Sequence, residues 1–272
     1  MIMKRFIYLI VALIALSSCT VSEGWNPNSD YVAQKAYGLV INEVHQQIHI
    51  LSYAQTVDYY SRSGDGERET IEDQHLLNTR LRQTDEGWEV VRSGKTAFTF
   101  IGNTPLGEVG SVWSVKVNHN FYTYNASLTY NASLTTNQYW TIECTGENRW
   151  KVRQSAIYES HTSEVEFDIV AGDQIAGQLE SSPIYKYTIE GECSIVQNEK
   201  VVAPYRIDMK IMEPVVFDNY KYYSNYTGTA YTKGKMSIRV TDYSTGEWVT
   251  TPFLYTIAPE RSNIKIEYLL IN

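Results

Sequence analysis

The chain has little of several residues on which whole classes of protein depend. Its 272 residues include only 3 Cys, 7 Pro and 16 Gly, with no repeating period. So few cysteines exclude a small disulfide scaffold, and so few Gly and Pro exclude collagen-like and low-complexity chains. Basic residues are also scarce, since 23 Lys and Arg stand against 31 Asp and Glu and give a net charge of −8. Because nucleic-acid binding requires clustered Lys and Arg, we expect no nucleic-acid partner.

Apolar residues and tyrosine are the plentiful ones. Hydrophobic residues make up 43% of the sequence and charged residues 20%, which is enough apolar side chain to bury a core and to exclude intrinsic disorder. The chain has 22 Tyr against 7 Phe, and Tyr favours the half-buried surface of a β-sheet. The length suits one large β body or two ordinary domains.

The N-terminus carries a targeting signal. Lys4 and Arg5 precede an apolar run at 6–16, which would rise only about 16 Å as a helix and is too short to span a bilayer. Such a segment is typical of a secretory signal that is removed. The run ends in Leu16-Ser17-Ser18-Cys19, an aliphatic residue, two small residues and a cysteine. These four residues resemble the lipobox of bacterial lipoproteins.

The resemblance implies a diacylglyceryl thioether on Cys19, cleavage before it and acylation of the new amino group. Residues 1–18 would be the lipoprotein signal peptide, 19–28 a tether and 29–272 the body, held on a membrane through Cys19. Each buried CH₂ of the acyl chains contributes about 0.8 kcal/mol to this attachment. Thr20 is not the Asp that retains many such proteins in the inner membrane, so the resemblance favours the outer membrane, with the facing side left open. An ordinary secretory signal is the alternative.

Cys144 and Cys193 remain as an even pair in an exported protein. An oxidising compartment allows them to form a disulfide, and two buried free thiols are the alternative. No Cys-x-x-Cys or Cys/His spacing indicates zinc.

The hydrophobic pattern first follows the period of a helix. Tyr37, Ile41, Val44, Ile48 and Leu51 recur at intervals of three and four, which is typical of an apolar stripe on a helix. The pattern predicts a helix from about residue 30 to residue 60. Its stripe should dock on a sheet, because no second helix of comparable clarity is present.

From residue 70 onward the pattern follows the period of a β-strand. The connections between strands look too short for crossover helices, so the pairing should be antiparallel. We therefore predict an α+β fold, mainly antiparallel β, with one long N-terminal helix packed on a β-meander or roll. A polar stretch at 171–183 is a possible subdivision of the body. Gln46 and Gln47 lie off the helical stripe, so replacing them should cost little stability.

Two sets of side chains are candidates for a reactive or metal-binding site. His45 and His49 stand four apart on the helix, a spacing that lets two imidazoles share a metal, but no Glu lies between them. Glu164, Glu166 and Asp168 share one strand face about 7 Å apart, as in a glycosidase or a calcium site. We expect the histidines to border the core, the carboxylates to form a solvated face, and neither a metal nor a cofactor to be bound.

Clustered tyrosines are the candidate binding patch. Exposed aromatic rings can stack on sugars or anchor a protein partner. The candidate residues are Tyr220, Tyr222, Tyr223, Tyr226, Tyr124 and Tyr130.

Together these features favour a lipid-anchored cell-envelope protein without catalytic activity, a binding or assembly module for a glycan or an envelope protein. The alternatives are an exported, glycosidase-like hydrolase that uses dispersed carboxylates and a purely structural envelope component. No nucleophile elbow, phosphate loop or dinucleotide fingerprint is present, which weakens the enzyme alternative.

The anchor can be tested directly. Cys19→Ser removes the thiol that would carry the lipid, so the variant should leave the membrane fraction or retain its signal peptide. Fractionation and intact mass measure both outcomes. Unchanged fractionation together with an unchanged mass would exclude the lipoprotein interpretation.

Overall fold

The structure is a computed structural model that describes twelve segments of the chain. They are residues 30–62, 70–73, 79–92, 94–102, 104–118, 134–158, 161–174, 185–197, 205–218, 231–242, 253–257 and 264–268. The signal sequence, Cys19 and the six tyrosines of the candidate patch lie outside these residues.

The described segments form one helix and thirteen strands. The helix α2 spans Asp30–Arg62, and no helix in this part of the chain is both long and apolar enough to cross a membrane. The strands are β1 Thr70–Asp73, β2 Thr79–Thr84, β3 Gly87–Arg92, β4 Lys95–Ile101, β5 Val112–Val117, β6 Leu134–Gly146, β7 Arg149–Tyr158, β8 His161–Gln174, β9 Tyr185–Gln197, β10 Tyr205–Asp218, β11 Tyr231–Asp242, β12 Phe253–Ile257 and β13 Ile264–Tyr268.

All thirteen strands belong to one sheet, and their order in the sheet is their order in the chain. Every neighbouring pair is antiparallel. The predicted class, α+β with mainly antiparallel strands and a helix packed on the sheet, is therefore confirmed. Most of the stretch 171–183 lies outside the described residues, and the strands on either side of it, β8 and β9, pair with each other.

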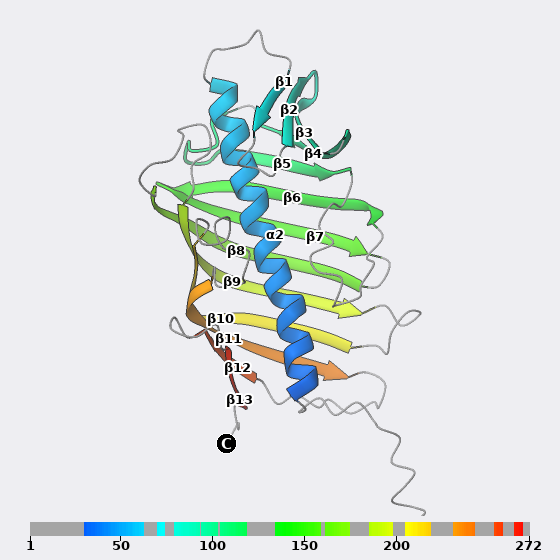
Figure 1. The fold of residues 1–272 in the computed structure, drawn as a ribbon, viewed down its shortest axis with the longest axis vertical. Helices are drawn as coiled ribbons and strands as arrows, with labels where there is room; N and C mark the ends of the chain where they lie inside the picture. Colours follow the sequence, from blue (N-terminus) through cyan, green and yellow to red (C-terminus); the bar gives the residue numbers. More distant parts are fainter. Residues whose placement is uncertain are drawn as a thin grey trace, which may run out of the picture.

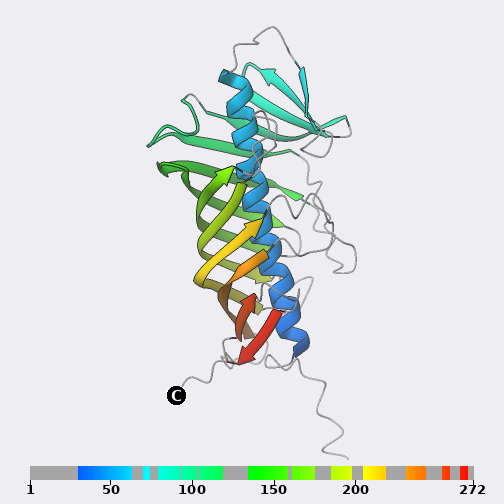
Figure 2. The same ribbon diagram turned by 60° about the vertical axis from the view of Figure 1, so that its left-hand side comes forward.

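The helix α2 crosses the strands along one face of the sheet (Figure 1). It begins beside β12 and β13 and ends near β1 and β2, and the view turned by 60° shows the strands curving past one side of it (Figure 2). Its 33 residues rise about 50 Å, which is close to ten strand spacings of about 4.8 Å. One helix is thus long enough to lie against most of a sheet this wide.

The middle of α2 is buried on all sides. The stripe residues Val44, Ile48 and Leu51 are at most 1% exposed, as predicted, but every residue from 43 to 58 is also buried. Gln46 and Gln47 lie off the stripe, yet they are only 8% and 0% exposed, so the reason given for expecting a low cost of replacing them does not apply. The sequence pattern underestimated the burial because a stripe identifies the most apolar side of a helix and assumes that the other side is wet.

Buried polar side chains of α2 are matched by partners on the sheet. The Trp140 indole donates to Gln47 Oε1 at 2.8 Å, and Gln47 Nε2 donates to Gln154 Oε1. About two helical turns further along α2, the Tyr187 hydroxyl donates to Gln55 Oε1 at 2.8 Å. These bonds offset the free-energy cost of removing the amides from water. A buried amide without a hydrogen-bond partner would destabilise the fold by that full cost.

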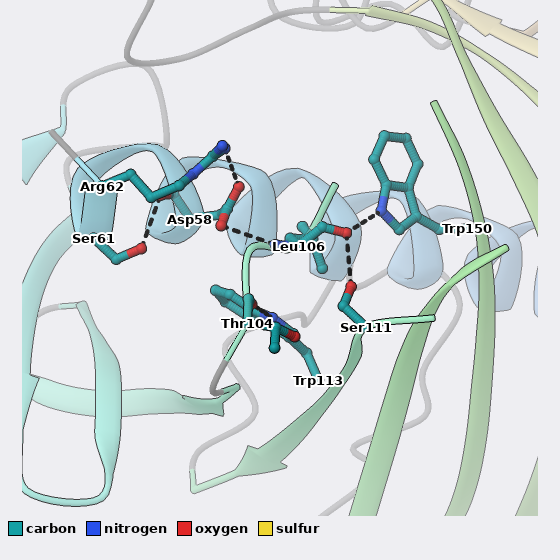
Figure 3. Close-up of polar contacts among 8 residues, drawn as sticks. All are labelled: Asp58, Ser61, Arg62, Thr104, Leu106, Ser111, Trp113 and Trp150. Carbon is teal, nitrogen blue, oxygen red and sulfur yellow. Dashed lines mark hydrogen bonds and ion pairs between the residues drawn. The ribbon is translucent and has the colours of Figure 1, made fainter. Parts of the chain in front are cut away.

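The C-terminal end of α2 is fastened to the connection between β4 and β5 (Figure 3). The backbone N–H of Leu106 donates to Asp58 Oδ1 at 2.9 Å, while Arg62 pairs with the other oxygen of the same carboxylate. The Leu106 carbonyl in turn accepts from the Trp150 indole at 3.0 Å and from the Ser111 hydroxyl at 3.1 Å. The Leu106 side chain is 1% exposed, so this residue joins the core, while its neighbours at 104, 105 and 107–110 are exposed.

The burial of Gln47 and Ile48 predicts two losses of stability. Gln47→Ala removes the acceptor of the buried Trp140 indole and the donor to Gln154 Oε1, at a cost of about 2–3 kcal/mol. Ile48→Ala leaves a cavity and should cost about 2–5 kcal/mol. Denaturant midpoints measure both, with the exposed Gln83 on β2 as a matched Gln→Ala control that should stay within about 0.5 kcal/mol. If Gln47→Ala proves as harmless as the control, the helix is not enclosed.

Candidate functional site

The outer face of the sheet, turned away from α2, carries two aligned rows of polar side chains across β6 to β11. The rows follow from the strand register, which places the two sets directly opposite one another on six consecutive strands. The first row is Thr141, Arg153, Glu166, Glu192, Lys210 and Ser237, and the second is Tyr139, Ser155, Glu164, Ser194, Asp208 and Arg239.

These two rows line a hollow of about 850 Å³. All twelve residues of the rows contribute to its lining, together with Arg206. Six strands at about 4.8 Å spacing make the rows about 24 Å long. Glu164 and Glu166 lie on this outer face as predicted, with Asp168 beyond the hollow on the same strand.

Gly191 lets β9 approach β8 at a position that faces the core, opposite Phe167. Its φ is +129°, a conformation that disfavours any residue with a side chain. A Cβ atom there would lie 2.2 Å from the Glu166 carbonyl oxygen and 2.9 Å from the Phe167 ring. The position therefore requires glycine, because a side chain there would collide with β8 and with the Phe167 ring in the core.

The carboxylates of β8 are held by neighbours on β7. Arg153 Nε donates to Glu166 at 2.9 Å and Lys151 Nζ at 3.1 Å, while Ser155 Oγ donates to Glu164 at 2.6 Å. The hydrogen bond from Arg153 lowers the pKa of Glu166, and the bond from Lys151 adds to the effect. A glycosidase needs one carboxyl with a raised pKa as its general acid, so the environment of Glu166 does not suit that role.

The β10–β11 end of the hollow is arranged differently. Arg206 Nε donates to both oxygens of Asp208, at 2.8 and 2.9 Å. Lys210 and Arg239 are exposed, and neither forms an ion pair within the described part of the chain. Glu192, directly opposite Lys210, is likewise without an ion pair there. This end therefore keeps charged groups that no other side chain of these segments neutralises.

Tyr139 supplies an aromatic ring at the opposite end. It lies on β6, is 57% exposed and lines the hollow. The six tyrosines proposed as a binding patch lie outside the described residues. Tyr139 falls in the aromatic-rich stretch around Tyr124 and Tyr130 but was not among those six. Lys210 and Arg239 were not singled out in the sequence, because only the register of distant strands places them on one surface with Tyr139.

His45 and His49 contact each other inside the core. Their Nε2 atoms are 2.7 Å apart, and both side chains are buried. Two nitrogens that share a tetrahedral zinc ion lie about 3.3 Å apart, so this spacing is that of a hydrogen bond. Within the described residues, no group of three or more His, Cys, Asp or Glu side chains is placed to hold a metal ion.

Cys144 and Cys193 are not bonded to each other. Both are free and buried, on β6 and β9. Two strands lie between them, so they are separated by about 14 Å or more, beyond the 7 Å that a disulfide spans. The prediction of a possible disulfide is therefore wrong, because an even number of cysteines in an exported chain does not determine how far apart the two cysteines lie in the fold.

A second polar cluster is enclosed between α2 and β8. Glu43 Oε1 lies 3.9 Å from His161 Nε2, and Ser163 follows two residues along the same face of β8. Among the residues that the structure describes, the Ser163 hydroxyl and Glu43 Oε2 have no hydrogen-bond partner. With Ser163 0% and His161 6% exposed, this serine is neither activated by the imidazole nor reachable by a substrate.

Comparison of the chain with protein families, with curated proteins and with solved structures found no match. The chemistry of the hollow is therefore the basis for assigning a function.

The buried imidazole of His45 predicts a dependence of stability on pH. Burial lowers its pKa from 6.5 to about 4, so between these values the unfolded chain binds a proton that the folded chain does not. The free energy of unfolding should fall as the pH falls from 6.5 to 4, by up to about 3 kcal/mol from this group. Urea midpoints at pH 7 and pH 4.5 test this, and His45→Gln should show a smaller drop than the wild type. Equal drops in both proteins would contradict it.

Proposed function

We propose that the protein is a lipid-anchored component of the bacterial cell envelope that binds carbohydrate in the hollow of the outer sheet face and does not act on it. The observation that carries the proposal is the hollow itself, about 850 Å³ lined by two rows of polar side chains. Its volume lies within the usual range for ligand sites, about 300–1,000 Å³.

The polar lining favours a sugar over a protein partner. Four carboxylates and four cations, together with serine and threonine hydroxyls, line the surface. The cores of protein interfaces are depleted of charged residues, whereas sugar hydroxyls donate to carboxylates and accept from guanidinium groups and hydroxyls. The exposed ring of Tyr139 supplies a face on which a sugar ring can stack.

In this proposal the lipid anchor holds the surface in the cell envelope. The lipobox resemblance at Cys19 supports attachment to the outer membrane through acyl chains. A tether at 19–28 reaches about 35 Å at most, and α2 begins beside β12 and β13 (Figure 1). In this proposal the strands form a meander that curls as a roll about α2, with its β12–β13 end nearest the membrane and the hollow above it.

A substitution that fills the hollow tests the function. Ser194 lies in the second row on β9, and Ser194→Tyr would place a ring in the middle of the hollow without lowering strand propensity. On a glycan array, the detergent-purified full-length protein should bind at least one carbohydrate, and Ser194→Tyr should weaken that binding at least tenfold.

Ser114→Tyr is the matched control, because Ser114 is an exposed residue on the same face, on β5, outside the hollow. It should bind as the wild type does. The proposal fails if the wild type binds no carbohydrate, or if Ser194→Tyr binds as well as Ser114→Tyr.

A further inference from the structure

The β10–β11 end of the hollow brings two cations and a hydroxyl together. Lys210 is directly opposite Ser237, and Arg239 follows Ser237 by two residues on the same face of β11. Directly opposite side chains have Cβ atoms about 4.5–5.5 Å apart, and diagonal ones about 7–8 Å. The long side chains of Lys210 and Arg239 can therefore reach one small group placed over Ser237.

Lys210 and Arg239 are available to bind a ligand, whereas several other cations on this face are held in ion pairs. On the same sheet face, Arg153 is paired with Glu166 and Glu143, and Lys235 with Glu213. The carboxylate nearest to Arg239 in the register is Asp208, which already accepts two bonds from Arg206. Lys210 and Arg239 have no such partner among the described residues. Glu192 lies directly opposite Lys210, so this end of the hollow has two carboxylates, Glu192 and Asp208, against three cations, Arg206, Lys210 and Arg239. The excess of one positive charge leaves room for one anion here, on a protein whose net charge is −8.

We propose that the carbohydrate bound in the hollow is acidic, with a sugar carboxylate held by Lys210, Ser237 and Arg239. This inference rests on the proposed function. The planar guanidinium of Arg239 matches a carboxylate in two parallel hydrogen bonds, Lys210 adds a point charge, and the Ser237 hydroxyl adds a donor.

The rest of the hollow fits the remainder of such a sugar chain. Glu192 and Ser194, next to the cationic end, offer acceptors to sugar hydroxyls. Tyr139 stands at the far end of the second row, about 24 Å from Arg239 by strand spacing, where a neutral ring can stack. The two cations Lys210 and Arg239 are thus at one end of the hollow and the exposed ring of Tyr139 is at the other. This arrangement suits an extended oligosaccharide with its carboxylate at the β10–β11 end.

The test compares acidic oligosaccharides with their own neutral forms. Oligogalacturonate, oligomannuronate and hyaluronan oligomers, each with a carboxyl-reduced counterpart, are titrated against the detergent-purified full-length protein. At least one acidic oligomer should bind, and its reduced form should bind at least tenfold more weakly. Lys210→Gln and Arg239→Gln should each weaken the acidic oligomer about tenfold, because a charge-assisted hydrogen bond is lost.

Lys235→Gln is the matched control, since Lys235 is a cation on the same strand and face but lies outside the hollow lining. The inference is overturned if Lys235→Gln weakens binding as much as the other two variants, or if polyglutamate binds as tightly as the sugar. Equal binding of acidic and reduced forms, with loss in Ser194→Tyr, would overturn the acidic specificity and leave carbohydrate binding in place. If no form binds the wild type, both proposals fail.

Discussion

The whole structure depends on the enclosure of α2 against the inner face of the sheet. Buried apolar side chains line that face on the strands from β4 to β11, and every strand in the described segments belongs to this one sheet, so none of them forms a second layer over it. Within the described residues, α2 is the helix that covers this face, and it is buried on all sides from residue 43 to residue 58. Removing apolar area from water is the largest favourable contribution to folding, and here the inner face of the strands and the buried part of α2 make that contribution together.

Because α2 is enclosed, its buried polar residues need partners on the sheet, and these partners fix the position of the helix. Gln47, Gln55 and Asp58 each bond to a different place, on β6 and β7, on β9 and on the β4–β5 connection. A rotation or a shift of the helix by one turn would break all three contacts and leave buried groups unpaired. Apolar packing alone tolerates such shifts more readily, so these bonds select one arrangement of helix and sheet.

The sequence predicts those features of the fold that depend on local periodicity. The stripe through Val44 and Ile48 and the wet row of Glu164 and Glu166 were both predictable, because a single helix or strand contains the pattern. The burial of Gln47 was not, since it depends on what lies across the helix.

The hollow was less accessible still to sequence reasoning. Its ends, Tyr139 and Arg239, are 100 positions apart in the chain, and only the register of five successive strand pairs places them on one surface. Cys144 and Cys193 show the reverse case, in which a count suggested a pairing that the strand order forbids. Composition and spacing identify candidate groups, whereas strand register decides which of them meet.

The order of the strands also bears on how such a chain can change in evolution. Because each strand pairs only with its neighbours in sequence, a hairpin can be gained or lost without rethreading the rest of the sheet. Each added hairpin widens the sheet by about 9.6 Å, which corresponds to six or seven helical residues at about 1.5 Å each. Descendants of different size should therefore lengthen or shorten α2 in step with their number of hairpins, and a mismatch would leave part of the inner face uncovered.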